Sequence, residues 1–123
     1  AGEKEKKETF KEIEHQKVFF DFKSAGISMD AGKGLSEVVK LMNENPEVKV
    51  EIQGHTENLE HANAQLATLS DDRAKNVFYY LTSKGIKENR LIYKGMGNAM
   101  PMSKDPSQVG RSQNRRVEFK IVE

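Results

Sequence analysis

The amino-acid sequence predicts a two-layer α/β domain, an α+β sandwich in which two main helices cover one face of a mixed four-stranded sheet. Segments that alternate apolar and polar residues, as strands do, are separated by two stretches with apolar residues at helical spacing. The last two strand-like segments follow one another without a helix, so the sheet is expected to be mixed. The predicted order is therefore β-α-β-α-β-β.

Composition narrows the class of protein. The 123 residues argue for one domain. Charged residues make up 32% of the chain, but the formal net charge is only +1, which gives no basic stripe for a nucleic-acid partner. Cysteine is absent, which excludes disulfides and cysteine-ligated metals. No apolar run approaches the ~20 residues of a membrane-spanning helix, so no span is expected within the chain.

The first residues of the chain differ in composition from the rest. Residues 1–14 are mostly charged and are predicted to form a tail or linker, with a solvated helix stub as the alternative. One domain is predicted over residues 15–123. Its first strand covers Val18 to Phe22, because Val18, Phe20 and Phe22 fall on one face at a period of two.

The first main helix is predicted to begin at an Asp30 cap and to run to about Asn43, before Asn45-Pro46. The second strand covers residues 48–53, where Val48, Val50 and Ile52 alternate with polar residues. Gly54 ends this strand. The segment 55–69 is less regular, with a helical turn expected near residues 61–67.

The second main helix is predicted to begin at a Ser70 cap, with Asp71 and Asp72 complementing the helix dipole in its first turn. Gly85 fits the position after its end. Residues 91–93 form the third strand, residues 98–113 a polar loop, and residues 117–122 the final strand. The buried face of the helix is formed by Ala74, Val77, Phe78 and Leu81.

Glu57 and Arg73 are the strongest candidates for a binding site. Glu57 follows a strand, and Arg73 lies at the start of a helix, positions where open α/β folds hold ligands. A guanidinium near a helix N-terminus suits a carboxylate, and an acid nearby suits an ammonium. The pair therefore fits a small zwitterionic ligand. The alternative is a plain Glu57–Arg73 salt bridge, or two unrelated solvated charges.

No set of residues predicts catalysis or a metal site. His55, Glu57 and His61 form only a loose cluster on a loop, without the spacing that sets two histidines on one helix face. Asp71 and Asp72 are adjacent rather than facing across a cleft. A nucleophile with an oriented base is also missing. The sequence therefore predicts a protein that is not an enzyme and needs no cofactor or metal.

Four motifs in order resemble the OmpA-like peptidoglycan-associated domain family, which includes the OmpA C-terminal, Pal and MotB domains. The resemblance covers about Val18 to Ile121. The matching residues are Phe20-Asp21-Phe22, Gly54-His55-Thr56-Glu57, Leu69-Ser70-Asp71-Asp72-Arg73-Ala74 and Gly110-Arg111-Ser112-Gln113-Asn114-Arg115-Arg116-Val117.

This resemblance implies non-covalent binding of the diaminopimelate end of a peptidoglycan stem peptide. Glu57 would bind the ammonium and Arg73 the carboxylate. The resemblance also implies a periplasmic domain tethered to the outer membrane, with other envelope proteins as candidate further partners. A monomer or a weak dimer is expected, and the sequence leaves the choice open. Supporting site residues would be Asp21, Phe22, Thr56, Asn58 and Arg116.

Three departures from the family pattern fall in the ligand region. Glu57 replaces the usual Asp, Lys23 replaces an acid that often follows Phe-Asp-Phe, and Leu66 stands where Asn is usual. The loop is also one residue longer. An alternative function is therefore an OmpA-like scaffold that has lost peptidoglycan binding and contacts proteins. A Lys23 amine against the Glu57 carboxylate would favour that alternative.

Overall fold

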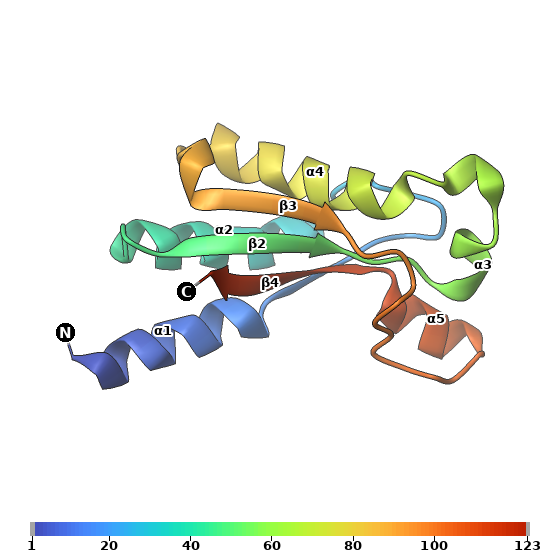
Figure 1. Cartoon of the computed structure of the whole chain (residues 1–123), viewed down its shortest axis with the longest axis horizontal. Coiled ribbons are helices and arrows are strands. Elements are labelled where there is room, and N and C mark those ends of the chain that lie inside the picture. Colours follow the sequence, from blue (N-terminus) through green and yellow to red (C-terminus); the bar gives the residue numbers. More distant parts are fainter. Residues whose placement is uncertain (1, 123) are drawn as a thin grey trace.

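The computed structural model describes residues 2–122 and shows a four-stranded sheet with the order β1-β4-β2-β3 (Figure 1). The strands are β1 (Lys17–Phe19), β2 (Lys49–Gly54), β3 (Leu91–Gly95) and β4 (Arg116–Val122). The helices are α1 (Glu3–His15), α2 (Met29–Glu44), α3 (Asn58–His61), α4 (Leu69–Ser83) and α5 (Gln108–Asn114), with 3₁₀ turns η1 (Ala64–Leu66) and η2 (Glu88–Arg90).

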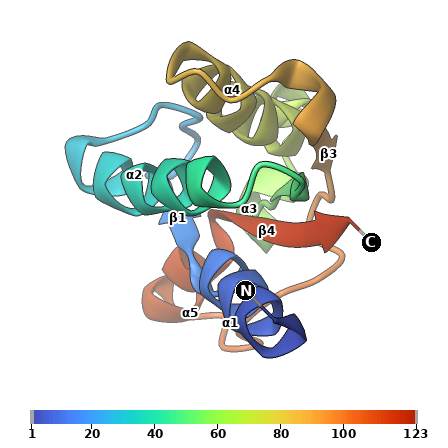
Figure 2. The ribbon, with the colours of Figure 1, turned by 90° about the vertical axis from the view of Figure 1, so that its left-hand side faces the viewer.

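The sheet is mixed, as predicted. β2 runs parallel to β3, whereas β4 is antiparallel to both β1 and β2. α2 and α4 lie side by side on one face of the sheet (Figure 2). The parallel β2–β3 pair is connected through α4, and β4 inserts between β1 and β2. The predicted fold class, with two main helices on one face, is confirmed.

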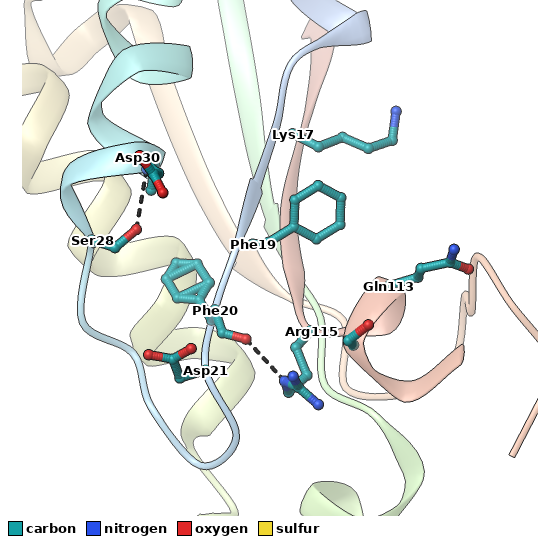
Figure 3. Close-up of a pocket in the computed structure, with 10 residues that line it drawn as sticks. Lys17, Phe19, Phe20, Asp21, Ser28, Asp30, Gln113 and Arg115 are labelled. Atoms are coloured by element: carbon teal, nitrogen blue, oxygen red, sulfur yellow. Dashed lines mark hydrogen bonds between the residues drawn. The ribbon is translucent and has the colours of Figure 1, made fainter. Parts of the chain in front are cut away.

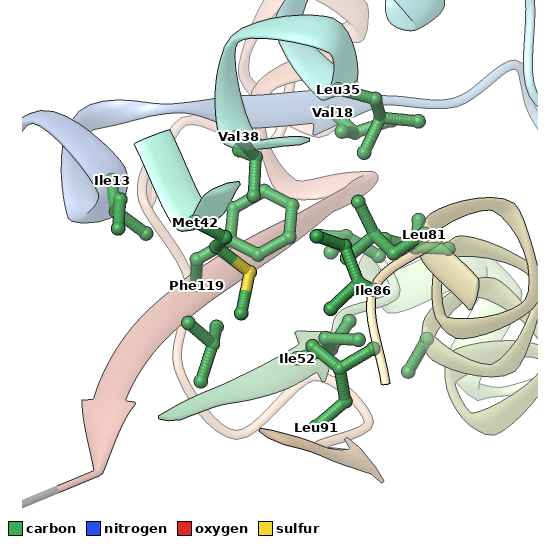
Figure 4. Close-up of a cluster of buried hydrophobic side chains, with 14 of the residues drawn as sticks. Ile13, Val18, Leu35, Val38, Met42, Ile52, Leu81, Ile86, Leu91 and Phe119 are labelled. Carbon is green, nitrogen blue, oxygen red and sulfur yellow. The ribbon is translucent and has the colours of Figure 1, made fainter. Parts of the chain in front are cut away.

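The core lies between this helix layer and the sheet (Figure 4). It is built almost entirely from aliphatic side chains, with Phe20 and Phe119 as its buried aromatic residues. Both helices contribute one apolar face at the expected spacing. Core side chains from the two helices and the sheet include Leu35, Val38, Met42, Ala74, Val77, Leu81, Val50, Ile52, Val117 and Phe119.

The segment predicted as a tail over residues 1–14 is helical from Glu3 and packs on the domain at its C-terminal end. Ile13 is fully buried and belongs to the core. The Glu14 carboxylate accepts a hydrogen bond from the backbone N–H of Ile121 at 2.9 Å. β1 pairs with β4 only as far as Glu118, and α1 packs against β4 beyond that point. The boundary predicted at residue 14 therefore falls inside a packed helix.

The first strand is shorter than predicted. It ends at Phe19, and the chain turns away so that Phe22 is 46% exposed rather than aligned with Val18 and Phe20. Lys23 has a positive φ of 64°, a conformation that non-glycine residues rarely adopt. The prediction of one buried face through Phe22 was wrong, because this tight turn redirects the chain toward α2.

Two helix caps also differ from prediction. Ser28 caps α2, its hydroxyl accepting from the N–H of Ala31, whereas Asp30 lies in the first turn. α4 begins at Leu69, so Ser70 lies inside the helix, where its hydroxyl accepts from the Gly97 N–H. The end of α4 follows prediction: Gly85 has φ +97° and makes the expected C-terminal turn.

The predicted loop over 98–113 contains a short helix that the sequence pattern did not indicate. α5 is capped by the hydroxyl of Ser107, which accepts from the N–H of Gly110. It brings Arg111 toward the end of β2. α3 and α5 both lie at one end of the long axis of the molecule, and the start of α1 lies at the other (Figure 1).

Two glycines let α4 approach the sheet closely. A Cβ on Gly54 would lie 1.9 Å from the carbonyl oxygen of Ser70, and one on Gly95 would lie 2.4 Å from the Asp71 carboxylate. Neither distance is sterically allowed. The first turn of α4 therefore rests directly on the ends of β2 and β3, which places Arg73 beneath the segment that leaves β2.

Candidate functional site

The guanidinium of Arg73 is fully buried, and each of its five N–H groups has an acceptor. Nε donates to the carbonyl oxygen of Ser24 at 2.8 Å. Nη1 donates to the His55 carbonyl at 2.9 Å and to Glu60 Oε1 at 2.8 Å. Nη2 donates to the Asp21 carbonyl at 3.2 Å and to Glu60 Oε2 at 2.6 Å. In this conformation Arg73 has no N–H left for a ligand.

Glu60 is the charge partner of Arg73. Its carboxylate is fully buried and also accepts from the backbone N–H of Lys23 at 2.7 Å and from that of Glu57 at 3.1 Å. Four donors therefore surround one carboxylate. Sequence reasoning missed Glu60, because a charged residue on an irregular segment is ordinarily solvated. The Glu57-x-x-Glu60 spacing was the available signal, since it matches a capping box.

Glu57 is buried too, but it pairs with Arg111 rather than Arg73. One of its carboxylate oxygens accepts from the N–H of Glu60 and so caps α3. The other, Oε2, lies 3.0 Å from Nε of Arg111. The direct Glu57–Arg73 salt bridge, which was the alternative to a ligand site, does not form, and two separate pairs stand in its place. The two pairs are adjacent, because Glu60 Oε1 contacts both Arg73 Nη1 and the Glu57 N–H.

Lys23 does not occupy the Glu57 carboxylate. Within residues 2–122, its ammonium makes no ion pair with Glu57 and lies 5.2 Å above the ring of Phe22. Its backbone N–H is the group that reaches the site, through Glu60. The contact that would have favoured the scaffold alternative is absent between these described residues. However, Arg73 is paired with Glu60, and Glu57 is paired with Arg111.

Asp21 reaches the site through its backbone only. Its carbonyl binds Arg73, whereas its side chain lines a separate surface groove of about 540 Å³ beside β1 (Figure 3). Arg115 lies in the same groove and donates from Nε to the Phe20 carbonyl at 2.9 Å. This hydrogen bond joins the start of the β1–α2 loop to β4 and so supports the backbone that holds Arg73.

Three other predicted residues frame the segment after β2. The backbone N–H of Thr56 donates to the Gly97 carbonyl at 2.9 Å, and Asn58 Oδ1 accepts from Asn98 at 2.9 Å. Arg116 is buried and donates to the Met100 carbonyl at 2.7 Å and to Glu118 at 2.9 Å. Arg116 thus fixes the loop over 98–103 rather than facing Glu60, and burial lowers its pKa from the usual value.

His55 is a buried, neutral residue next to this arginine. Burial, followed by the positive charge of Arg116, lowers its pKa from 6.5 to about 4, although Glu118 opposes the shift. Its Nε2 lies 3.4 Å from Glu118 Oε2. The role of this histidine is structural, because its side chain is enclosed beneath the loop. Among the residues that the structure describes, no group of three or more histidines and carboxylates could hold a metal ion.

A surface cavity of about 250 Å³ opens beside Arg111. Asn58 and Leu59 of α3 form one side, and Pro101 and Pro106 lie among the residues of the other. Arg111 is 29% exposed, whereas the Glu57 carboxylate behind it is fully enclosed. A cationic group entering this cavity would therefore meet Arg111 before Glu57.

The OmpA family model matches residues 19–115 of this chain. The chain belongs to the OmpA family. It is 35% identical over 112 residues to photosystem I P700 chlorophyll a apoprotein A2 of Gloeobacter violaceus. It is 32% identical over 105 residues to outer membrane protein A of Bordetella avium. It is 31% identical over 101 residues to the peptidoglycan-associated lipoprotein of Brucella melitensis. These matches cover 86%, 85% and 82% of this chain.

The family fold is also seen in solved structures. The peptidoglycan-associated lipoprotein of Burkholderia pseudomallei superposes with a TM-score of 0.79 at 22% identity, covering 87% of this chain and 90% of that one.

The chain spans 13% of the photosystem protein, 54% of the Bordetella protein and 60% of the Brucella lipoprotein. The Bordetella relative is named as an outer membrane protein, and the Brucella relative as a peptidoglycan-associated lipoprotein. None of the helices between residues 2 and 122 combines the length and apolar composition needed to cross a membrane.

Proposed function

We propose that this domain binds peptidoglycan non-covalently and anchors an envelope protein to the cell wall. The observation that carries the proposal is the pair of buried charges, Glu57 and Arg73, gathered around the four-residue helix α3 in a chain of this family. The named lipoprotein relative supports a wall ligand. The domain would act in the periplasm, tethered to the outer membrane by the protein that carries it.

The ligand we propose is the free diaminopimelate end of a stem peptide. Its ammonium would enter by the cavity beside Arg111 and pair with Glu57, and its carboxylate would pair with Arg73. Thr56 and Asn58 would hold the segment that carries Glu57. On the other side, the loop with Asp21 and Phe22 would supply backbone support. Arg116 would act indirectly, through the loop that it fixes.

A second candidate function is favoured by a specific observation. Glu60 already neutralises Arg73, and Arg111 already neutralises Glu57. Both charged groups that a zwitterion would need are thus paired within the domain. A domain fixed in this state would keep the fold, bind no stem peptide and serve as a protein-interaction module.

Co-sedimentation with purified sacculi, followed by calorimetry with a diaminopimelate-ended stem peptide, separates these functions. Wall binding predicts sedimentation of the unaltered domain, competition by the free peptide, and loss of both in Glu57→Gln. Glu47→Gln is the matched control, because Glu47 is exposed in the turn between α2 and β2. Circular dichroism of each variant shows whether the fold is retained. Failure of the folded, unaltered domain to sediment would favour the protein-interaction function.

A further inference from the structure

We propose that Glu60 is an internal competitor for the ligand carboxylate, so that the domain binds a wall peptide only when Glu60 leaves Arg73. This inference rests on the proposed function for the identity of the ligand. The occupation of Arg73 by a carboxylate is a feature of the fold itself. Glu60 would then determine how tightly, and to which carboxylates, the site binds.

The surroundings of Glu60 form a receptor for a carboxylate. Arg73 presents two N–H groups side by side, at 2.8 and 2.6 Å from the two oxygens. The backbone N–H groups of Lys23 and Glu57 complete the set at 2.7 and 3.1 Å. All four are donors, and none depends on the rest of the glutamate side chain. A free carboxylate of similar size could make the same four contacts.

The energetic argument follows from burial. Arg73 and Glu60 are both 0% exposed, so removal of one charge leaves the other buried without a counter-charge. A ligand carboxylate must therefore replace Glu60 rather than join it. Binding then requires a state in which Glu60 has left Arg73. The apparent affinity for the ligand is the intrinsic affinity of that state multiplied by the fraction of molecules that occupy it.

α3 is the segment that must move. It is only four residues long, and the Glu57 side chain and the Glu60 backbone hold its first turn together in a capping box. Moving Glu60 outward therefore also frees the Glu57 carboxylate oxygen that caps it. Arg111, partly exposed at the cavity, can turn away without unwinding a helix. Of the two internal pairs, the one made by Glu60 is thus the greater obstacle.

The inference is tested by removing the carboxylate and returning it in solution. Glu60→Ala and Glu60→Gln are compared with the unaltered domain by thermal unfolding in sodium acetate and in sodium chloride of equal ionic strength. Glu88→Ala, at an exposed glutamate in η2, is the matched control. We expect acetate to raise the melting temperature of Glu60→Ala by several degrees relative to chloride. Acetate should leave the melting temperatures of the unaltered domain, Glu60→Gln and Glu88→Ala unchanged. In the unaltered domain and Glu88→Ala the Glu60 carboxylate fills the space, and in Glu60→Gln the amide fills it.

Calorimetry and co-sedimentation then use the diaminopimelate-ended peptide and sacculi. Glu60→Ala should bind the peptide at least about tenfold more tightly than the unaltered domain, as expected if the open state is a minor one. If Glu60→Ala folds only in acetate, that result also supports the inference. If acetate stabilises the variant but the peptide binds no more tightly, Glu60 is a structural ion pair and the competitor role is wrong.

The outcomes separate this inference from the proposed function. Sedimentation of the unaltered domain with no gain in Glu60→Ala supports wall binding and overturns the role of Glu60. Sedimentation of Glu60→Ala alone supports the role of Glu60 and shows that the unaltered domain is not a wall anchor under those conditions. If neither protein sediments and acetate has no effect on folded Glu60→Ala, both proposals fail.

Discussion

The carboxylate of Glu60 and the guanidinium of Arg73 face one another inside the domain, joined by hydrogen bonds of 2.8 and 2.6 Å. They are 13 positions apart in the chain, and neither side chain is exposed. The pair connects α3 to α4, and the carbonyls bound by the same guanidinium connect it to the β1–α2 loop. Arg73 therefore organises this end of the domain, because its guanidinium joins α4 to α3 and to the β1–α2 loop.

Arg73→Ala is expected to lower the free energy of unfolding by about 3–5 kcal/mol, because it leaves the Glu60 carboxylate buried without a counter-charge. The double variant Arg73→Met/Glu60→Leu should be clearly more stable than the single one, since an apolar pair of similar volume carries no desolvation cost. Urea unfolding at neutral pH measures both. A loss below about 1 kcal/mol for Arg73→Ala would show that the pair is open to solvent.

Gly54→Ala is expected to destabilise the domain by more than about 3 kcal/mol or to prevent folding, since its Cβ would overlap the Ser70 carbonyl. Gly32→Ala is the contrasting variant. Gly32 lies in the first turns of α2, where a Cβ would come no closer than 3.8 Å to Tyr80. Gly32→Ala should therefore raise the free energy of unfolding by about 0.5–1 kcal/mol. Thermal unfolding of the two variants gives shifts of opposite sign. Equal shifts would contradict the close approach of α4 to β2.

The stability of the domain should fall as the pH is lowered from about 6.5 to about 4, with a contribution of about 3 kcal/mol from His55. In the unfolded chain the imidazole binds a proton near pH 6.5, whereas in the folded domain it does so only near pH 4. The unfolded state therefore gains stability over that range. Unfolding of the domain and of His55→Gln at a series of pH values isolates this effect. Parallel pH profiles would show that His55 is not shielded.

Ile13→Ala is expected to cost about 2–4 kcal/mol, as for other large-to-small changes at fully buried positions. Lys11→Ala, at an exposed position of the same helix, should change stability by less than about 0.5 kcal/mol. Denaturant unfolding checks both. If the two variants were equally stable, α1 would be a separable linker, as its charged composition indicates, rather than part of the domain.

Asn114→Asp is expected to cost about 1–3 kcal/mol and to loosen the loop before α5. Asn114 accepts from the N–H groups of Met102 and Ser103 and donates to the Ser103 carbonyl at 2.9 Å. Aspartate keeps the acceptor but places a second oxygen opposite that carbonyl. Hydrogen exchange at Met102 and Ser103 should become faster in the variant. Unchanged exchange would mean that other contacts hold the loop.

Much of the fold could be predicted because its core residues follow simple periods. Alternation in residues 48–53 and 117–121 and helical spacing in α2 and α4 are set by burial against one shared core. α1 was not predicted as part of the domain, because Ile13 is one of few buried residues in a charged helix. α5 was missed for a related reason: it is seven residues long and is fixed by a cap and by loop contacts rather than by an apolar face.

The candidate site could be predicted less well, because long-range pairing decides it. The motifs singled out Glu57 and Arg73, which are both buried and paired, but they did not indicate the partners of these residues. Arg73 pairs with a glutamate that the sequence presents as a solvated loop residue, and Glu57 pairs with an arginine 54 residues later. Charge type and spacing alone cannot distinguish a free pair from two pairs that neutralise one another.

The position of α1 determines how the domain would bear a load. Its N-terminal end and the α3–α5 end lie at opposite extremes of the long axis, and the strands run along that axis (Figure 1). A pull applied between the start of α1 and a ligand held at the α3–α5 end would therefore act parallel to the strands. Hydrogen bonds of the β1–β4 and β2–β4 pairs would then resist together in shear, instead of breaking one after another as in peeling. Such a geometry favours mechanical endurance even where the ligand is held only weakly.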